Sequence, residues 1–304
     1  MANPWLERRV LAFAHQAGEK EGPSSTLWAI ARALSLGVTG IELDVHATAD
    51  GELVVGHDPT LDRTTNGSGA IAKTTREEIS RLDNAYWFVP GEATVRGRPA
   101  EQYAFRGRAP ADRRFAVAAL DDVLEMTAGT VVNLDIKQTA PAVEPYEEAL
   151  ARTLAAHHRR DDVIVASFLD AAIERFSQCA PHVATSLGQN AIVGFVQAVA
   201  RGEQPDPSLG RHAAIQVPPS FLGVELVSAR FVEAAHALGL AVHVWTIDEP
   251  GEMERLCGLG VDGIMSDRPS VLVEVLTRLG VAWRPPGGSA RSQGQTNRAE
   301  RCQP

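Results

Sequence analysis

Residues 40–58 read GIELDVHATADGELVVGHD, and this stretch is the most informative part of the chain. It predicts an apolar strand, a short turn and a second strand that ends at His57. Since residues i and i+2 of a strand point to the same face, Glu42 and Asp44 project together. Two neighbouring carboxylates raise each other's pKa unless a positive charge lies between them, and a hard divalent cation is the usual solution. A metal with a histidine beside it indicates hydrolysis or phosphoryl transfer.

Working outward, short runs rich in β-branched and apolar residues recur between helical stretches. Runs that are apolar on both faces are typical of buried parallel strands. The alternation predicts an α/β chain that folds as a (β/α)8 TIM barrel, in which 52–57 forms an extra strand in a hairpin with strand 2. The predicted strands lie near 10–15, 40–46, 131–137, 163–168, 183–187, 213–217, 241–247 and 263–266, and the clearest helical patterns cover 26–36, 145–157 and 228–238.

Several polar residues fall toward the carboxyl ends of these predicted strands. In a (β/α)8 barrel those ends form one face, where active sites are built. We therefore expect residues that are far apart in the sequence to converge there. They are His15, Glu42, Asp44, Asp135, Lys137 and Trp245.

Two segments interrupt the alternation. Residues 59–119 form a long insertion after the strand 2 hairpin, rich in aromatic residues and arginine, and such insertions often act as lids or recognition loops. Residues 284–304 are rich in Pro, Gly, Ser, Gln and Arg, which is typical of a disordered tail. We thus expect one barrel domain over 1–283, followed by that tail.

Composition excludes several classes of protein. The net charge is −9; residues 284–304 contribute four Arg and one Glu, or +3, so residues 1–283 hold −12, which argues against nonspecific nucleic-acid binding. Three widely spaced cysteines, Cys179, Cys257 and Cys302, indicate neither a disulfide framework nor a thiolate metal site. The N-terminal apolar run is too short for a signal peptide or a membrane-spanning helix. A cytoplasmic location fits these features best, and the oligomeric state cannot be inferred.

The motifs together resemble those of the glycerophosphodiester phosphodiesterases, TIM-barrel enzymes similar to phosphatidylinositol-phospholipase C. The resemblance covers about residues 10–275, and its motifs occur in the family order. They are AFAHQAG at 12–18, E-x-D at 42–44, T-x-D-G at 48–51, HDPTLDRTT at 57–65, VVNLDIK at 131–137, VHVWTID at 242–248 and GVDGIMSDRP at 260–269.

The resemblance implies a metal-dependent hydrolysis of glycerophosphodiesters to glycerol 3-phosphate and an alcohol. Glu42, Asp44 and Asp135 would bind the cation, Mg or Ca. His15 and His57 would act as general acid and base, in an order that the sequence does not reveal. The substrate would contact Lys137, Gln16 and Trp245. Asp58 is expected to have a structural role, and His46 and His243 are expected to serve packing rather than chemistry.

One motif departs from the family pattern. Where the family has H-R-G, this chain has His15-Gln16-Ala17, and glutamine cannot supply the charge or the bidentate fork of an arginine. One hypothesis is that an arginine of the insertion folds over the barrel mouth as a substitute. The six candidates are Arg96, Arg98, Arg106, Arg108, Arg113 and Arg114, and the alternative is that all six only solvate a loop.

Two further functions stay open. The first is lysophospholipase D-like cleavage of lysophospholipids, in which the aromatic residues at 86–105 would contact an acyl chain. The second, motivated by Gln16, is a degenerate barrel that binds phosphodiesters without turning them over. The two histidines and three acids argue against this second possibility.

Overall fold

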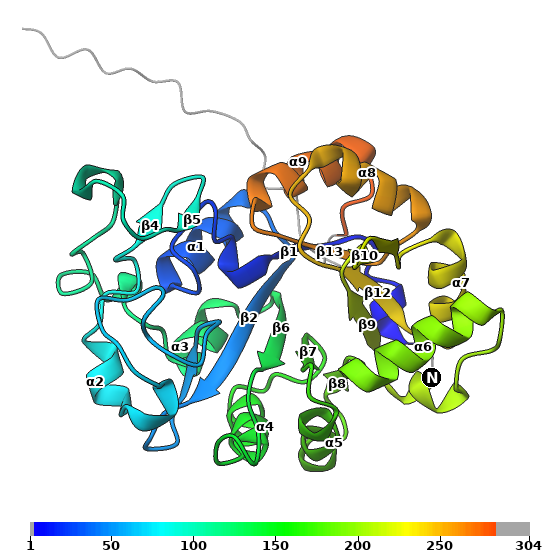
Figure 1. The fold of residues 1–304 in the computed structure, drawn as a ribbon, viewed down its shortest axis with the longest axis horizontal. Helices are drawn as coiled ribbons and strands as arrows, with labels where there is room; N and C mark the ends of the chain where they lie inside the picture. The colour runs from blue at the N-terminus through cyan, green and yellow to red at the C-terminus, as the bar shows by residue number, and fades with distance from the viewer. Residues whose placement is uncertain (1–2, 284–304) are drawn as a thin grey trace, which may run out of the picture.

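The structure, a computed structural model, describes residues 3–283, so the predicted tail lies outside the described residues. Eight parallel strands form a barrel with helices around it (Figure 1). All eight match the predicted strand positions within a few residues, and the (β/α)8 prediction is confirmed. The barrel strands are β1 (Leu11–Ala14), β2 (Gly40–Ala47), β6 (Val131–Ile136), β7 (Val163–Ala166), β8 (Ala184–Thr185), β9 (Ala214–Val217), β12 (Ala241–Val244) and β13 (Gly263–Ser266).

The strand order is β8-β7-β6-β2-β1-β13-β12-β9, and the two outer strands of this path meet to close the barrel. The closing contact is narrow. Ser186 and Ala214 form a single parallel bridge, the N–H of Leu187 donates to the carbonyl of Ala214, and the N–H of Ala213 donates to that of Thr185. The seam between β8 and β9 therefore has fewer backbone hydrogen bonds than the long β2–β6 ladder.

A helix follows each barrel strand and covers its outer face (Figure 1). Caps set the helix starts: the hydroxyl of Thr26 accepts from the N–H of Ala29, and that of Ser228 accepts from Phe231. The barrel helices are α1 (Leu27–Leu36), α3 (Leu120–Met126), α4 (Glu147–Ala156), α5 (Asp170–Cys179), α6 (Gln189–Arg201), α7 (Ala229–Ala237), α8 (Pro250–Leu259) and α9 (Pro269–Leu279). No helix within 3–283 is both long enough and apolar enough to cross a membrane.

The predicted hairpin is also present, because β3 (Leu53–Val55) pairs antiparallel with the end of β2. The insertion that follows holds α2 (Arg76–Ser80) and two paired two-residue strands, β4 (Phe88–Val89) and β5 (Ala93–Thr94). Its remaining regular structure is a set of 3₁₀ turns: Ile71–Lys73, Ala100–Gln102 and Arg113–Phe115. The insertion lies on the α1 and α3 side of the barrel (Figure 1).

Apolar side chains fill the N-terminal part of the barrel interior. A buried cluster joins residues of β1, β6, β7, β9, β12 and β13, and Trp5, in a 3₁₀ turn over Pro4–Leu6, packs against it. Space there is tight, since a Cβ at Gly40 would stand 2.3 Å from the Phe13 ring. The polar residues that line the pocket therefore gather toward the opposite, C-terminal mouth of the barrel.

Candidate active site

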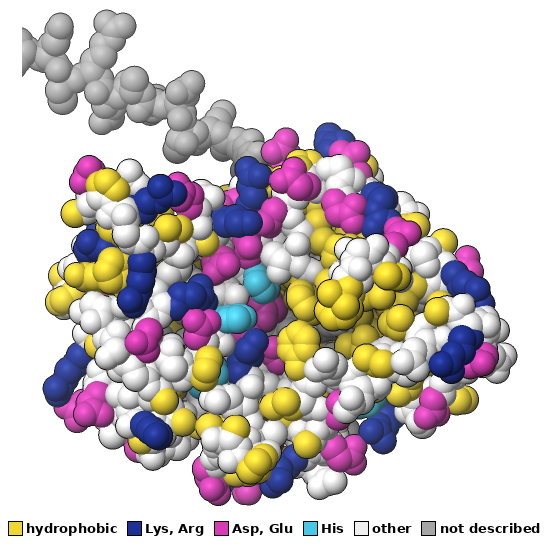
Figure 2. Space-filling model, in the orientation of Figure 1, with side chains coloured by type: hydrophobic (Ala, Val, Ile, Leu, Met, Phe, Trp, Pro, Cys, Tyr) yellow, Lys and Arg dark blue, Asp and Glu magenta, His cyan; other side chains and the backbone are white. Residues whose placement is uncertain are grey.

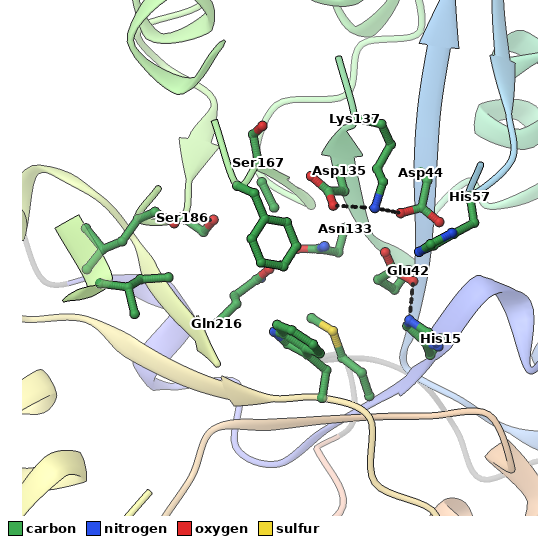
Figure 3. A pocket seen from close by; sticks show the side chains of 16 residues that line it. His15, Glu42, Asp44, His57, Asn133, Asp135, Lys137, Ser167, Ser186 and Gln216 are labelled. Atoms are coloured by element: carbon green, nitrogen blue, oxygen red, sulfur yellow. Dashed lines mark hydrogen bonds and ion pairs between the residues drawn. The ribbon is translucent and has the colours of Figure 1, made fainter. Parts of the chain in front are cut away.

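A pocket opens at the C-terminal mouth, and seven of the eight predicted site residues line it (Figure 3). Residues far apart in the sequence thus meet, as the predicted (β/α)8 fold led us to expect. The polar lining consists of His15, Glu42, Asp44, His57, Asn133, Asp135, Lys137, Ser167, Ser186 and Gln216. The rest of the lining is Ala166, Phe168, Leu187, Ile192, Trp245 and Met265.

Strand register brings the acidic residues together. In the β2–β6 ladder Asp44 lies beside Asp135, and Glu42 lies beside Asn133. The ammonium of Lys137 lies 3.2 Å from Asp44 Oδ1 and 3.4 Å from Asp135 Oδ2. The other oxygens, Asp44 Oδ2 and Asp135 Oδ1, are buried and have no hydrogen-bond partner among residues 3–283. Since buried carboxylate oxygens normally have partners, this group has spare acceptor capacity.

The first predicted catalytic histidine is held by the last motif of the chain. His15 follows β1, and its Nδ1 donates to Asp267 Oδ1 at 2.6 Å. Its Nε2 faces the pocket, 3.9 Å from Glu42 Oε2 (Figure 3). Asp267 is in turn near Lys20, whose ammonium lies 3.6 Å from Asp267 Oδ2. A carboxylate on Nδ1 fixes the ring orientation and leaves Nε2 available for proton transfer.

The second histidine has a matching arrangement. The Nδ1 of His57 donates to Asp58 Oδ1 at 2.8 Å, and Arg63 Nε donates to Asp58 Oδ2 at 2.9 Å. The ring of His46 lies behind this loop, with Nε2 3.4 Å from the carbonyl oxygen of His57. Asp58 therefore contacts a histidine of the pocket directly, while buried His46 supports the backbone.

Burial and mutual repulsion strongly raise the pKa values of two acidic residues in the pocket. Burial, together with the negative charge of Asp44, raises the pKa of Glu42 to about 8. Burial also raises the pKa of Asp135 to about 7, against the opposing pull of Lys137. For His15, burial alone would lower the pKa, but the charges of Glu42 and Asp267 outweigh it and raise the pKa to about 9. Glu42 and Asp135 therefore hold a proton more readily than ordinary carboxyl groups do.

The three predicted metal ligands, Glu42, Asp44 and Asp135, suit a metal ion by their chemistry but not by their present geometry. Carboxylate oxygens are the ligands that Mg²⁺ and Ca²⁺ prefer. Within residues 3–283, however, no three His, Cys, Asp or Glu side chains already stand in an arrangement that could hold a metal ion. Lys137 instead bridges two of the three predicted ligands, Asp44 and Asp135.

Gln16 is the one predicted site residue that does not line the pocket. It is buried, with its backbone in the left-handed region at φ 47°, and its N–H donates to Glu42 Oε2. Its side-chain Oε1 accepts from Ser24 Oγ at 2.8 Å and lies 3.5 Å from Arg63 Nη2. The cation beside Gln16 is therefore Arg63 of the HDPTLDRTT motif.

None of the six arginines considered as substitutes lines the pocket. Five of them have partners within the insertion: Arg96 donates to the carbonyl of Asp62, Arg98 pairs with Glu92, Arg106 donates to the carbonyl of Tyr86, Arg108 lies over the Phe105 ring and Arg114 pairs with Asp112. The hypothesis that one of them replaces the family arginine gains no support from these positions.

Other residues of the pocket were not singled out from the sequence. Gln216 Nε2 donates to Asn133 Oδ1 at 2.7 Å and lies 3.3 Å from His243 Nδ1, forming a polar floor. His243 is fully buried behind this floor, as its predicted packing role implies, and burial lowers its pKa to about 3. Asp267 could have been identified, because it lies in the quoted GVDGIMSDRP motif. Phe168 and Gln216 lie outside any quoted motif.

Comparisons with known proteins point to one family. The model of the glycerophosphoryl diester phosphodiesterase family matches residues 15–271. A glycerophosphodiester phosphodiesterase of Caldanaerobacter subterraneus is 31% identical over 274 residues, which cover 90% of this chain and 100% of the relative. One from Bacillus altitudinis is 27% identical and covers 86% of this chain and 96% of the relative.

Solved structures share the fold. The crystal structure of a glycerophosphodiester phosphodiesterase from Agrobacterium tumefaciens aligns with TM-score 0.66 and 23% identity, covering 87% of this chain and 99% of that one. A phosphodiesterase from Oleispira antarctica, in complex with its product sn-glycerol-3-phosphate, aligns with TM-score 0.68 and 21% identity, covering 90% and 99%. The family match and the 31% identical relative show that this chain belongs to the glycerophosphoryl diester phosphodiesterase family and is an enzyme, a phosphoric diester hydrolase.

Proposed function

We propose that this enzyme hydrolyses glycerophosphodiesters to glycerol 3-phosphate and an alcohol, with His15 and His57 as its general acid and base. The observation that supports this most directly is the pair of histidines that line one pocket, each with Nδ1 on a carboxylate. The Oleispira antarctica phosphodiesterase was solved with its product sn-glycerol-3-phosphate, which is also a product of the reaction proposed here. Binding without turnover is disfavoured, since a passive site has no need of two oriented proton carriers.

The chain's own residues account for the proton transfers. One histidine accepts the proton of the attacking hydroxyl, either of water or of the substrate glycerol. The other donates a proton to the leaving alcohol oxygen as the P–O bond breaks. Attack by the glycerol hydroxyl gives a cyclic phosphate, which water then opens to glycerol 3-phosphate. Lys137 binds a non-bridging phosphate oxygen and offsets its charge.

Glu42, Asp44 and Asp135 are the residues that would hold a divalent cation, Mg or Ca. Their fit rests on the all-oxygen donor set and on the unpartnered oxygens of Asp44 and Asp135. Such an ion, when bound, neutralises negative charge on the phosphate. Lys137 contacts the other oxygens of Asp44 and Asp135, so its ion pairs would compete with the cation for these two carboxylates.

Chelation tests the metal assignment. EDTA should abolish hydrolysis of glycerophosphocholine, glycerophosphoethanolamine and glycerophosphoglycerol, and added Mg²⁺ or Ca²⁺ should restore it. Glu42→Gln should weaken metal binding, measured by calorimetry, while thermal unfolding without metal changes little. Full turnover in excess EDTA would rule the metal site out.

Substitution of the histidines tests their roles. His15→Ala and His57→Ala should each lower kcat by roughly 10²–10⁴, the usual contribution of a positioned acid or base. The double variant should lose far less than the product of the two effects, because the pair acts as a unit. His157→Ala, which changes a histidine that pairs with Asp121 outside the pocket, serves as a comparison. Near-normal turnover by either single variant would return that histidine to a structural role, and no turnover by the native enzyme on any substrate would favour the binding barrel.

A further inference from the structure

One loop directs charged side chains toward both candidate histidines. Residues 18–22 follow the 3₁₀ turn over His15–Ala17 and read GEKEG, with three charges between two glycines. Figure 2 shows acidic and basic side chains, in magenta and dark blue, around the two histidines near the centre of this face. Neither Glu19 nor Lys20 lines the pocket, so both reach the histidines through other side chains. We call residues 18–22 the charged loop.

Backbone contacts hold the charged loop in place without its side chains. The N–H of Lys20 donates to the carbonyl of Asp267 at 3.2 Å, and the N–H of Gly91 donates to the carbonyl of Lys20 at 2.8 Å. Gly18 has φ 87°, and a Cβ there would lie 2.7 Å from Cγ of Pro269. The loop thus lies between the last motif of the chain and the insertion, and replacing the Lys20 side chain should leave its backbone in place.

Lys20 contacts the carboxylate that orients His15. Its ammonium lies 2.5 Å from Asp248 Oδ2 and 3.6 Å from Asp267 Oδ2. The other oxygen of Asp267 accepts from His15 Nδ1, and the other oxygen of Asp248 accepts from the N–H of Asp267 at 2.9 Å. Both carboxylates are largely buried, where charges repel more strongly than in water, so the cation between them offsets this repulsion. Lys20 therefore favours the arrangement in which Asp267 faces His15.

Glu19 reaches the other histidine through two side chains. Its Oε2 lies 3.4 Å from Arg63 Nη1, and Arg63 Nε donates to Asp58 Oδ2 at 2.9 Å. The other oxygen of Asp58 accepts from His57 Nδ1 at 2.8 Å. Consecutive residues of the charged loop, Glu19 and Lys20, are thus joined to the carboxylates that orient both histidines of the pocket.

We propose that Glu19 and Lys20 are positioning residues, which from one loop hold the two histidines of the pocket at a fixed mutual spacing. This inference rests on the proposed function, in which one histidine accepts a proton and the other donates one. Lys20 acts through Asp267, and Glu19 acts through Arg63. Partly exposed ion pairs contribute little to folding stability, whereas a small displacement of a reacting group lowers a rate strongly. Loss of either side chain should therefore appear in turnover rather than in stability.

Lys20→Met tests the link to His15. For glycerophosphoethanolamine, kcat should fall roughly tenfold and KM should change by less than about twofold, because the lost interaction orients a proton carrier and does not bind the substrate. Lys20→Arg, which keeps the charge, should recover part of kcat. Lys73→Met changes an exposed lysine of the insertion, in the 3₁₀ turn over Ile71–Lys73, and should behave as wild type.

Double variants test the two routes. Lys20→Met should have little further effect on kcat in an Asp267→Asn background, since its route to the histidine is then already broken. Glu19→Gln should lower kcat less than Lys20→Met does, because two side chains separate it from its histidine, and it should add little to Arg63→Gln. Wild-type kcat for either single variant, or effects that multiply in either pair, would overturn the proposal.

An NMR measurement separates failure of this inference from failure of the proposed function. With ¹⁵N-labelled histidine, the Nδ1–H proton of His15 is identified by its loss in His15→Gln. Its hydrogen bond to Asp267 should protect this proton from exchange with water, and Lys20→Met, but not Lys73→Met, should accelerate the exchange.

Two outcomes of this measurement contradict different claims. Absence of turnover by the native enzyme would overturn the function, while the exchange rate would still decide whether Lys20 holds the histidine. Unchanged exchange in Lys20→Met, or a fall in kcat matched by a large fall in the urea midpoint, would show that Lys20 is only structural and overturn the positioning role.

Discussion

At the scale of single residues, each candidate catalytic histidine is oriented by a carboxylate on its Nδ1. Asp267 orients His15 from the far end of the chain, and Asp58 orients His57 from the next position. Asp58 is itself held by Arg63, whose guanidinium also reaches Glu19 at 3.4 Å. The hydrogen bonds to His57 and Arg63 outweigh the effect of burial and lower the pKa of Asp58, which keeps it an anionic acceptor.

This arrangement makes Arg63 a positioning residue. Arg63→Gln should lower kcat roughly tenfold, or about 1.4 kcal/mol of transition-state stabilisation, with a smaller change in KM, because Asp58 would then hold His57 less firmly. Arg63→Lys, which keeps the charge, should recover part of the loss. Steady-state kinetics measure the effect.

Arg114→Gln is the matched control, since Arg114 pairs only within the insertion, with Asp112 at 2.7 Å. It should keep wild-type kcat. Equal kcat for Arg63→Gln and wild type would show that His57 needs no support from this side. A tenfold loss in one of the six insertion arginines would instead revive the substitute-arginine hypothesis.

At the scale of secondary-structure elements, the seam between β8 and β9 has a side-chain link in addition to its few backbone contacts. His212 Nδ1 donates to Thr185 Oγ1 at 2.9 Å, while Arg211 Nε donates to His212 Nε2 at 3.1 Å. A nitrogen that accepts cannot hold a proton, so the ring must be neutral. Burial and the charge of Arg211 lower the pKa of His212 to about 4.

Stability should therefore depend on pH through this residue. The unfolded-state pKa is about 6.5, so the folded state is disfavoured once the ring must be protonated. The contribution of His212 to the free energy of unfolding is complete above pH ~6.5 and is lost as pH falls toward 4. His212→Asn should lower the urea midpoint at pH 7.5 but flatten its decline between pH 6.5 and 4.5.

Exposed His182 provides the comparison for this measurement. His182→Asn should leave both the midpoint at pH 7.5 and its pH dependence unchanged. If His212→Asn retained the full acid sensitivity of the wild type, another buried group, such as His243, would have to explain it.

At the scale of the whole molecule, the insertion packs as a second layer against the barrel wall. Trp28 of α1 stacks on Phe115 at 5.7 Å and meets Phe105 at 4.6 Å. The amide of Asn84 donates to the carbonyl of Ser24, and the N–H of Val55 donates to that of Ala118. The buried aromatic residues of the insertion, Phe88, Tyr103 and Phe115, therefore serve packing.

Phe115→Ala should accordingly destabilise the enzyme by about 3–5 kcal/mol, the range for removing a buried phenylalanine. Turnover per folded molecule should stay near wild type, because Phe115 does not line the pocket. Phe221→Ala, which truncates an exposed phenylalanine, should change stability by no more than about 0.5 kcal/mol. Denaturant unfolding measures both, and comparable losses in the two variants would contradict the packing role.

Local pattern in the sequence was sufficient for the strands, the hairpin and most of the candidate site. Glu42 and Asp44 share a face because a strand has a period of two, and the end of each apolar run marks the barrel mouth, so seven site residues could be placed before any contact was known. These properties depend on neighbours in the sequence alone.

Tertiary structure decided the rest, because it depends on which distant loops meet when the barrel closes. Only closure brings Asp267 to His15 and leaves Gln16 facing Ser24 and Arg63. Likewise, the apolar lining of the pocket combines Phe168, Leu187 and Trp245, which follow three different strands, β7, β8 and β12. Periodicity indicates which way a side chain points from its own strand, but its partners depend on strand order and register, which are set by the packing of the whole barrel.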